Sequence, residues 1–431
     1  MELTPDKIYR IFLAHPVIST DSRHIEAGSL FFALKGDSFN GNEFADNALQ
    51  QGACYAIVDE AKHAGDPRIV LVEDVLSTLQ ALARHHRMQF DIPVIAITGS
   101  NGKTTSKELI YKVLSEKFRT LATKGNLNNH IGVPLTLLGI NSDTEIAIIE
   151  MGANHPGEID FLCQIAQPNH GLITNIGKAH LGGFGGFEGV IRTKTELSRF
   201  LAERDGVMLL NTGDELLNKH VHCHKMVTYG PPPAMVSLLN HVSDPYVKVE
   251  LRFPDHSTVF IESKLYGNYN TSNILAAACI GHQFGISPEQ IKTAIEAYHP
   301  GNNRSQIVKT DLNLLVLDAY NANPSSMVAA LTMFAESAYT KKTVILGDML
   351  ELGEESDHEH LHILGLLDQI GFQHVYLVGS IFTRLNTRRE NTCFQDTELA
   401  KMWLEHHKIE NSTILIKGSR GIGLEKLAGS F

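Results

Sequence analysis

The segment from Val94 to Phe118 constrains the fold more than any other part of the sequence. A β-branched apolar run, Val94 to Thr98, leads directly into Gly99-Ser100-Asn101-Gly102-Lys103-Thr104-Thr105, and an amphipathic helical pattern follows. A strand, a Gly-rich turn and a helix form a phosphate cradle, because backbone N–H groups of the turn and of the helix N-terminus face the phosphate oxygens. Lys103 would neutralise phosphate charge, and the Thr104 hydroxyl would reach a magnesium ion.

This loop is two residues shorter than the general phosphate-loop pattern, since only Ser100 and Asn101 separate its glycines. A purely structural tight turn is therefore the alternative interpretation. The strand before the loop and the helix after it are the context that the motif requires. They favour nucleotide binding over the structural turn.

Short apolar runs alternate with longer amphipathic stretches along most of the chain, which is typical of α/β domains with parallel sheets. An early α/β region is expected from strands at 28–34 and 55–58 and a helix at 44–51. The strands expected around the phosphate loop are 94–98, 146–149, 172–174 and 207–210, followed by antiparallel strands within 231–257 and a helix from Asn270. A second doubly wound sheet is expected from 312–317, 343–346, 375–378 and 413–416.

The length of 431 residues exceeds one compact core and suggests several domains. Turn residues at Asp91-Ile92-Pro93 and His299-Pro300-Gly301 predict boundaries between domains 1–91, 92–300 and 301–431.

Composition narrows the possible partners. The net charge of −11 and the lack of a basic stripe argue against nucleic acid. Charges in the first residues exclude a signal-peptide core, and no apolar run reaches membrane-spanning length, so we expect a cytoplasmic protein without membrane insertion. A monomer is expected separately, since these features do not determine the oligomeric state. The five cysteines are far apart and are expected to be reduced.

Histidines occur in two groups that could suggest metal binding. The group at 220–224 lies in a polar connection without a second ligand pair at zinc spacing, so a surface loop is expected. His358, His360 and His362 do not follow the HExxH order and are expected on a solvated helix face.

Several motifs together resemble those of the Mur ligases, the amide-forming enzymes of peptidoglycan precursor synthesis. The resemblance rests on Gly99 to Thr105 and on four later motifs. These are 125–134 (GNLNNHIGVP), 150–153 (EMGA), 175–180 (NIGKAH) and 194–196 (KTE). It implies three domains: a small α/β uridine-nucleotide domain, a central ATPase-like parallel-sheet domain and a C-terminal Rossmann-like domain.

Three of these motifs carry candidate magnesium ligands. Glu150 ends an apolar strand, where a carboxylate suits a hard cation, although a helix-cap or salt-bridge role is the alternative. His180 follows another strand and could be a second ligand or a structural residue. Lys194 would ordinarily be a solvated cation. The resemblance implies that Glu150 and His180, with Thr104, bind two magnesium ions, and that Lys194 is carbamylated and thus anionic beside them.

The resemblance also implies the nucleotide and substrate contacts. Gly267 to Asn273 is similar to the family motif Gly-x-His-Asn-x-x-Asn, with Tyr269 in place of the His, which leaves only the His contact in doubt. ATP would be contacted by the phosphate loop (Gly99 to Thr105), Asn270, Asn273, Arg304 and Asp318. The UDP-linked substrate would be contacted by Ser22, Arg23, Asn128 and Asn129, and the incoming dipeptide by Asn321 and Asn323.

Motifs near the end of the chain indicate which amine is added. The stretches 318–326 (DAYNANPSS), 346–353 (LGDMLELG) and 417–420 (KGSR) are similar to those of members that add D-alanyl-D-alanine to UDP-N-acetylmuramoyl-tripeptide. Members that add the third amino acid usually have a His after Asp-Tyr-Ala, which is absent here, but single-residue addition to the dipeptide remains the alternative. The expected reaction uses ATP to form an acyl phosphate, which the amine then attacks.

Overall fold

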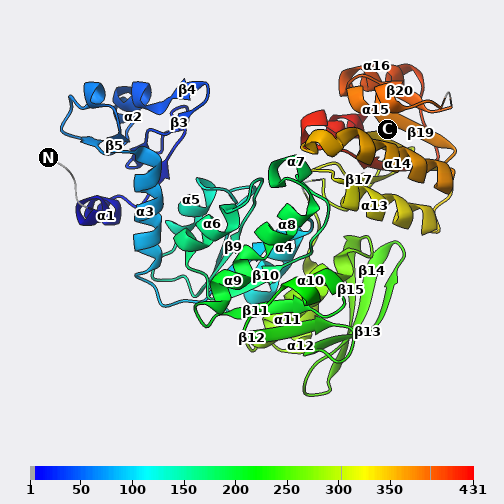
Figure 1. Cartoon of the computed structure of the whole chain (residues 1–431), viewed down its shortest axis with the longest axis horizontal. Helices are drawn as coiled ribbons and strands as arrows, with labels where there is room; N and C mark the ends of the chain where they lie inside the picture. Colours follow the sequence, from blue (N-terminus) through cyan, green and yellow to red (C-terminus); the bar gives the residue numbers. More distant parts are fainter. Residues whose placement is uncertain (1–4, 302, 389) are drawn as a thin grey trace. The chain divides into compact units, whose positions relative to one another are not determined.

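The computed structural model describes residues 5–301, 303–388 and 390–431. Contacts within the chain divide it into two compact units, one of Met1–Ala96, Phe118–Gly152 and Ile159–His170, the other of Ile97–Lys117, Ala153–Glu158 and Gly171–Phe431. The structure is mixed α/β with parallel sheets, and its elements follow one another along the chain as Figure 1 labels them.

The first sheet is built from the early part of the chain and is parallel throughout, in the order β1-β2-β5-β6. Helix α3 begins where the Asp74 carboxylate accepts a hydrogen bond of 2.6 Å from Ser77 N, which is a typical N-cap. The elements are α1 (Pro5–Ala14), β1 (Ile18–Ser19), β2 (Leu30–Phe32), β3 (Lys35–Gly36), β4 (Phe39–Asn40), α2 (Ala45–Gln50), β5 (Tyr55–Val58), β6 (Ile69–Leu71) and α3 (Val75–Arg87). The expected strands and helix of this region are confirmed.

The nine-stranded sheet has the order β15-β14-β13-β12-β11-β10-β7-β9-β8. Its strands β7 and β9 are buried along their whole length, as expected for parallel strands covered by helices. They are β7 (Val94–Thr98), β8 (Thr120–Ala122), β9 (Ile146–Glu150), β10 (His170–Ile173), β11 (Val207–Asn211), β12 (Lys225–Gly230), β13 (Val236–Ser243), β14 (Tyr246–Arg252) and β15 (Thr258–Tyr266).

The last strands of this sheet are antiparallel. The expected antiparallel pair is confirmed as β13 and β14, but a third strand, β15, continues the sheet beyond the expected range. Its alternating burial shows that one face is covered and the other exposed. The helices of this region are α4 (Lys103–Leu114), α5 (Gly132–Leu137), α6 (Glu158–Ala166), α7 (Leu181–Phe184), α8 (Phe187–Lys194), α9 (Glu196–Ala202), α10 (Glu215–His220), α11 (Asn270–Gln283) and α12 (Pro288–Ala297).

The third sheet has the order β16-β17-β21-β18-β19-β20, with β16 antiparallel to β17 and the other neighbours parallel. Its elements are β16 (Gln306–Lys309), β17 (Leu314–Asp318), α13 (Pro324–Glu336), β18 (Lys342–Gly347), η3 (Gly353–Glu355), α14 (Ser356–Ile370), β19 (His374–Val378), α15 (Ser380–Leu385), β20 (Thr392–Phe394), α16 (Thr397–His406) and β21 (Thr413–Lys417). The expected second parallel sheet is confirmed.

The cysteines and the apolar content of the helices complete the description of the fold. All five cysteines are free, as predicted. Among the described residues, none of the helices has the length and apolar character needed to cross a bilayer.

Candidate active site

The phosphate loop joins β7 to α4, and two glycines give it its shape. Gly99 has φ of 138°, and a Cβ there would lie 2.0 Å from Thr174 Oγ1. Gly102 has φ of 78°, and a Cβ there would lie 2.7 Å from Asn273 Oδ1. Both positions therefore require glycine, for conformation and for space. The short loop is a tightly packed phosphate cradle at the start of a helix.

Asn175 holds the loop from the neighbouring strand end, a role that the sequence did not reveal. Its side-chain Oδ1 accepts a hydrogen bond of 3.0 Å from Asn101 N, and its Nδ2 donates one of 3.0 Å to Asn101 O. The Asn175 carbonyl also accepts from Ser100 N. This amide fixes the backbone of the loop, so Asn175 is a positioning residue.

Lys103 and Lys194 carry the two candidate positive charges of this region. Lys103 Nζ donates hydrogen bonds to the carbonyls of Gly99 at 2.7 Å and Ser100 at 3.2 Å, which holds the ammonium over the loop. Lys194, at the end of α8, is only 1% exposed. Burial, reinforced by the charge of Lys103, lowers the pKa of Lys194 to about 7. Burial rules out the alternative of a solvated cation, and the lowered pKa makes the neutral amine accessible near neutral pH.

Phe184 connects Lys194 with His180. Lys194 Nζ lies 5.1 Å from the centre of the Phe184 ring, and the His180 ring meets the same aromatic ring edge-on at 6.2 Å between centroids. His180 begins α7 in a left-handed conformation with φ of 51°. Its Nδ1 lies 2.5 Å from a carboxylate oxygen of Glu351. The structure therefore brings Lys103, His180 and Lys194 into one neighbourhood.

Glu150 belongs to the other compact unit, where it is 1% exposed at the end of β9. Asn128 Nδ2 donates a hydrogen bond of 2.8 Å to Glu150 Oε1. The Asn129 side chain instead accepts from the backbone N–H groups of Ile131 and Gly132, which stabilises the turn before α5. Asn128 thus orients the carboxylate, whereas the Asn129 side-chain oxygen accepts hydrogen bonds from the local backbone.

The amides predicted to contact adenine form an internal network behind the phosphate loop. Asn273 Oδ1 accepts a hydrogen bond of 2.9 Å from Ser106 Oγ, and its Nδ2 donates one of 2.8 Å to Asn270 Oδ1. Asn270 Nδ2 donates to Tyr266 O at 2.8 Å. These bonds support α4 and Gly102 from α11, so the two amides shape the phosphate site.

We expect Asn273→Ala to raise the apparent KM for ATP by roughly tenfold, because it removes the amide that packs against Gly102 and Ser106. The KM for the amine substrate should change little. Steady-state kinetics with each substrate varied in turn would measure this. Ser272→Ala, one residue away, is the control. An effect on the amine substrate alone would contradict the assignment.

Two arginines lie close to the Tyr320 ring in the C-terminal region. The guanidinium of Arg304 lies 3.5 Å from the centre of the Tyr320 ring, and that of Arg420 lies 5.3 Å from it. Asp318 is paired with Lys417 Nζ at 2.6 Å and accepts from Ser305 N at 3.3 Å. Its carboxylate is thus already held by protein groups, while the arginines are stacked on an aromatic face.

Asn321 and Asn323 follow the end of β17. The Asn321 side chain accepts from Ala322 N. Asn323 is the N-cap of α13, where its side chain accepts from Ser326 N, and its Nδ2 donates a hydrogen bond of 2.8 Å to Asn101 Oδ1 of the phosphate loop. The structure thus brings Asn323 onto the phosphate loop, a contact that its predicted role at the dipeptide did not include.

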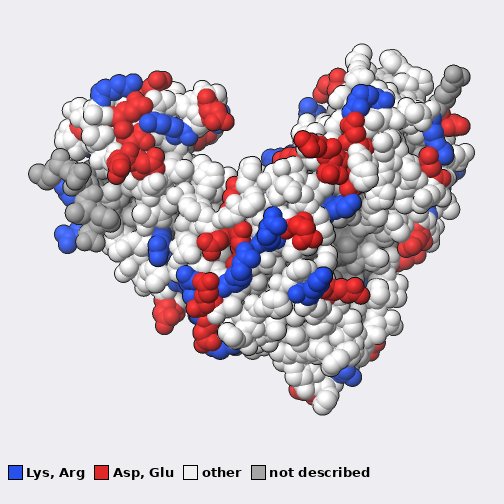
Figure 2. Space-filling model, viewed as in Figure 1, with Lys and Arg blue, Asp and Glu red and all other residues white. Residues whose placement is uncertain are grey.

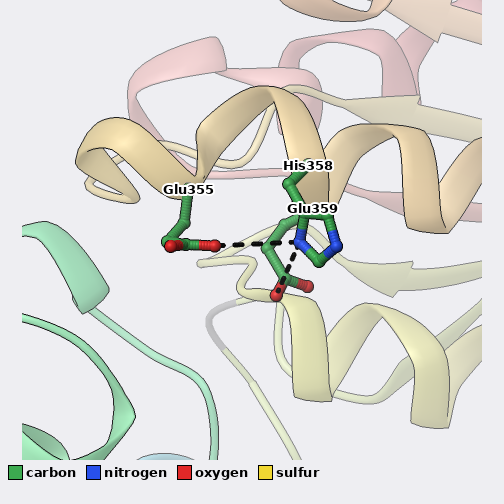
Figure 3. A group of neighbouring side chains, drawn as sticks. All are labelled: Glu355, His358 and Glu359. Carbon is green, nitrogen blue, oxygen red and sulfur yellow. Dashed lines mark ion pairs between the residues drawn. The ribbon is translucent and has the colours of Figure 1, made fainter.

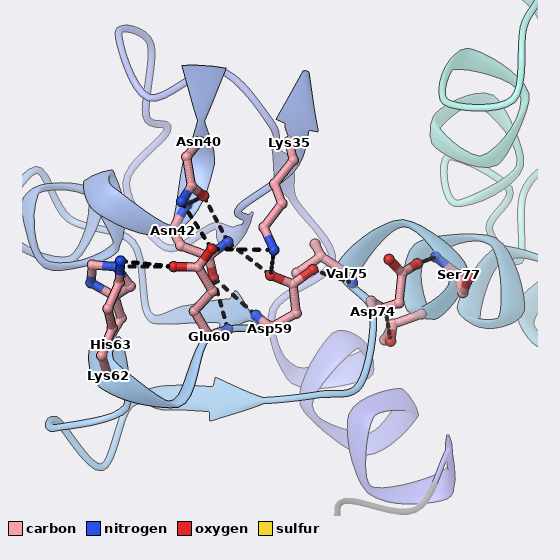
Figure 4. A network of polar contacts seen from close by, with 11 residues as sticks. Lys35, Asn40, Asn42, Asp59, Glu60, Lys62, His63, Asp74, Val75 and Ser77 are labelled. Carbon is pink, nitrogen blue, oxygen red and sulfur yellow. Dashed lines mark hydrogen bonds and ion pairs between the residues drawn. The ribbon is translucent and has the colours of Figure 1, made fainter. Parts of the chain in front are cut away.

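Ser22 and Arg23 occupy a turn of the first region. Arg23 pairs bidentately with Asp21, at 2.9 Å and 2.7 Å, and the Ser22 carbonyl accepts from Gln51. The buried Asn42 instead organises a network at the end of β5, with hydrogen bonds to Asn40 and Asp59 (Figure 4). Lys35 is paired with Asp59 at 2.7 Å in the same network. This polar cluster is a feature of the first region that the sequence did not indicate.

The histidines of α14 do not all lie on a solvated face. His358 and His362 are exposed as expected, but His360 is 0% exposed, so the expectation is wrong for this residue. Its Nε2 accepts a hydrogen bond from Met349 N, and its Nδ1 lies 2.7 Å from Ser356 O. Burial lowers its pKa. The fold buries this one helix position beside Phe382 and Asp348, which the spacing of the histidines could not reveal.

Glu355, His358 and Glu359 form the one group of metal-ligand type that the described residues offer (Figure 3). Glu359 is buried, and Lys178 Nζ lies 2.6 Å from its carboxylate. A divalent ion at this carboxylate would lie beside an ammonium, which disfavours metal binding. His220, His222 and His224 contribute to no such group among the described residues.

Charged side chains of both signs are interspersed over the face shown in Figure 2. No extended basic surface appears on that face.

The parallel sheet, the Gly-rich loop at the end of β7 and the lysine over that loop define a nucleotide-phosphate-binding α/β protein. Three family models identify the family of the chain. The model described as "Mur ligase middle domain" matches residues 97–281, and "Mur ligase, glutamate ligase domain" matches residues 303–420. The model described as "Mur ligase family, catalytic domain" matches residues 16–88. The chain belongs to the Mur ligase family.

Individual relatives are similar over nearly the whole chain. The UDP-N-acetylmuramoyl-tripeptide–D-alanyl-D-alanine ligase of Bacillus subtilis is 34% identical, over 95% of this chain and 92% of the relative. A crystal structure of MurF from Acinetobacter baumannii is 33% identical, with a TM-score of 0.87 over 96% of this chain and 92% of that one. MurF ligase from Thermotoga maritima, solved in complex with ADP, is 27% identical, with a TM-score of 0.86 over 97% of both chains.

Proposed function

We propose that this chain is an ATP-dependent ligase that adds D-alanyl-D-alanine to UDP-N-acetylmuramoyl-tripeptide. The observation that carries the proposal is the 34% identity to a ligase of that name over 95% of the chain, together with a complete phosphate loop. The motifs at 318–326, 346–353 and 417–420 indicate the same amine substrate. The alternative, addition of a single amino acid to the UDP-linked dipeptide, has no comparable support.

The reaction has two chemical steps. The terminal carboxylate oxygen of the tripeptide attacks the γ-phosphorus of ATP, which forms an acyl phosphate and releases ADP. The free amine of D-alanyl-D-alanine then attacks the acyl carbon, the C–O bond to phosphate breaks, and amide, inorganic phosphate and a proton are released. No side-chain nucleophile is required, so the protein positions the reactants, neutralises charge and excludes water.

The residues of the chain divide this work. The Lys103 ammonium, held over the loop by Gly99 O and Ser100 O, is placed to neutralise the transferring phosphoryl group. Backbone N–H groups at the start of α4 would bind the phosphates. Domains 1–91, 92–300 and 301–431 would bind the UDP-linked substrate, ATP and the dipeptide, respectively. We expect the enzyme to act as a cytoplasmic monomer.

Magnesium takes hard oxygen ligands such as carboxylates and hydroxyls, and two of the three candidate donors are of that kind. Glu150 provides a buried carboxylate, Thr104 a hydroxyl and His180 an imidazole. A carbamate on Lys194 would add an anionic oxygen donor, and the lowered pKa of this lysine supports carbamylation because carbon dioxide combines with neutral amines. Two bound magnesium ions would neutralise charge on the transferring phosphoryl group.

The decisive experiment is an assay of phosphate release from ATP with the two other substrates added separately and together. Release that requires both UDP-N-acetylmuramoyl-tripeptide and D-alanyl-D-alanine, with formation of the UDP-linked pentapeptide by mass spectrometry, supports the proposal. Release with the UDP-linked dipeptide and a single amino acid instead would support the alternative. Release that needs neither would refute both.

Substrate binding is expected to compact the protein, because groups from the domains proposed to bind ATP and the dipeptide must surround a hydrolysable intermediate. Small-angle X-ray scattering with a nonhydrolysable ATP analogue plus UDP-tripeptide should give a smaller radius of gyration than the protein alone. The control is each ligand by itself. An unchanged radius with both ligands would count against closure.

A further inference from the structure

Lys178 and Glu359 join segments that are far apart in the sequence. Lys178 lies between β10 and α7, in the part that matches the middle-domain family model, and Glu359 lies on α14, in the part that matches the glutamate-ligase-domain model. Lys178 Nζ and Glu359 Oε1 are 2.6 Å apart. Both residues belong to the same compact unit.

The environment of the pair is asymmetric. The Lys178 side chain is 44% exposed, whereas the Glu359 side chain is 2% exposed. A buried carboxylate is costly without a hydrogen-bonding partner of opposite charge. Among the described residues, Lys178 is the one that donates a hydrogen bond to it, and the other oxygen, Oε2, is buried without a hydrogen bond. His358 Nδ1 lies 3.7 Å from one oxygen of the carboxylate (Figure 3). His362 Nδ1 lies 3.8 Å from the other oxygen.

Three uncharged contacts accompany this ion pair. Lys178 N donates a hydrogen bond of 2.8 Å to Ser325 Oγ at the start of α13. A Cβ on Gly177 would lie 2.9 Å from the same oxygen. A Cβ on Gly182 would lie 2.9 Å from Gly353 N, so the two backbones touch directly. The segment 177–182 is thus held against the C-terminal region near both of its ends.

This segment is also bonded to the phosphate loop. Ser100 Oγ donates to Gly177 O at 2.9 Å, and Gly177 N donates to the same Ser100 oxygen at 2.9 Å. His180 lies in the segment, between the contacts of Lys178 and Gly182. A short covalent and hydrogen-bonded path therefore runs from Glu359 through Lys178 and Gly177 to Ser100.

We propose that Lys178 and Glu359 form an electrostatic clasp that holds α14 on the segment 177–182 and thereby positions the phosphate loop and His180. Neither residue contacts the reacting atoms, so both are positioning residues. Without the ammonium, the buried Glu359 carboxylate loses its hydrogen-bonded partner of opposite charge, which weakens the contact between α14 and the segment. The clasp therefore favours the docked arrangement, and its strength depends on salt because Lys178 is partly exposed.

The test compares Lys178→Met, Glu359→Gln and the charge exchange Lys178→Glu/Glu359→Lys with Lys426→Met. Lys426 is the matched control because its pair with Glu398, 3.4 Å apart, lies wholly within the C-terminal region and is exposed. Thermal unfolding of each variant identifies any that fail to fold. The charge exchange keeps the test informative if Glu359→Gln is unstable.

The first measurement is amide hydrogen exchange of segments 177–184 and 350–355 in the protein without substrates. We expect faster hydrogen exchange in Lys178→Met and wild-type rates in Lys426→Met. The double variant Lys178→Glu/Glu359→Lys should have rates between those of Lys178→Met and the wild type. This readout does not depend on the reaction. Wild-type exchange in Lys178→Met would overturn the clasp.

The second measurement rests on the proposed function. Lys178→Met should lower kcat at least about fivefold, with the KM for the UDP-linked substrate nearly unchanged. Added KCl should lower wild-type kcat and affect Lys178→Met less, and the charge exchange should recover part of the loss. If Lys178→Met and the double variant Lys178→Glu/Glu359→Lys lose kcat equally, with the same dependence on KCl, the proposal would be overturned. An inactive wild-type protein would instead refute the proposed function. The hydrogen-exchange rates would then decide whether the clasp exists.

Discussion

Lys103→Ala should lower kcat by roughly 10²- to 10³-fold or more while the protein remains folded. The ammonium is held over the phosphate loop by two backbone carbonyls and packs no core, so its removal costs charge stabilisation and little stability. Because the interaction grows as charge moves during phosphoryl transfer, kcat should fall more than the affinity for ATP. Phosphate release and equilibrium binding of a nonhydrolysable ATP analogue would measure both quantities.

Lys112→Ala is the control for this experiment, since Lys112 lies on the same helix, α4, and is exposed. It should retain wild-type kcat and melting temperature. Lys103→Arg should remain strongly impaired, because a guanidinium cannot reproduce the position of the ammonium between the two carbonyls. Near-normal turnover of Lys103→Ala would remove the phosphate loop from the mechanism.

The central strands of the parallel sheets were predictable because burial on both faces imposes a simple apolar pattern, whereas short edge strands such as β1, β8 and β20 were not predicted. Strands such as Val94–Thr98 and Thr413–Lys417 contain continuous apolar runs, at 94–97 and 414–416, and both strands are buried along their length. Strand β15 was harder, since its alternating residues Thr258–Tyr266 include charged side chains on the exposed face. Antiparallel strands were therefore predicted within 231–257, and β15, which follows them, was missed.

The phosphate loop was predictable for a different reason, because one short segment contains nearly all of its chemistry. Interactions between distant residues were not. Asn175 holds the loop from another strand end, and Lys178 meets Glu359 across 181 positions of sequence. His360 was assigned to the solvent from its spacing, although the fold buries it beside Phe382. A local pattern cannot report such contacts, because the topology alone creates them.

Burial also changes the chemistry expected of Lys194. In the sequence it follows a polar helical pattern, but in the fold it lies at the end of α8, against Phe184. Loss of hydration disfavours the ammonium, and the nearby Lys103 charge disfavours it further, so the pKa falls to about 7. The neutral amine required for carbamylation is then abundant near neutral pH, whereas an exposed lysine with a pKa of about 10.4 would provide very little.

The proposed carbamate should therefore form with a pH dependence set by this pKa. At a fixed concentration of dissolved carbon dioxide, the neutral fraction rises from about a tenth at pH 6 to about nine tenths at pH 8. Carbamylation should increase over this interval, in the direction of deprotonation. Carbon-13 NMR with labelled bicarbonate would detect it in the wild-type protein but not in Lys194→Ala, with the exposed Lys219→Ala as the control.

If an anion at this position is needed, Lys194→Ala should lose roughly 10²-fold or more in kcat, and added acetate or another short carboxylate should restore part of it. Lys194→Arg should stay inactive even though it keeps a positive charge, because the working group would be negative. Enzyme depleted of carbon dioxide should lose activity and regain it when bicarbonate is added. Full activity of Lys194→Ala, or of the depleted enzyme, would show that the buried amine acts only in packing, and its lowered pKa would then be a consequence of burial without a role in the reaction.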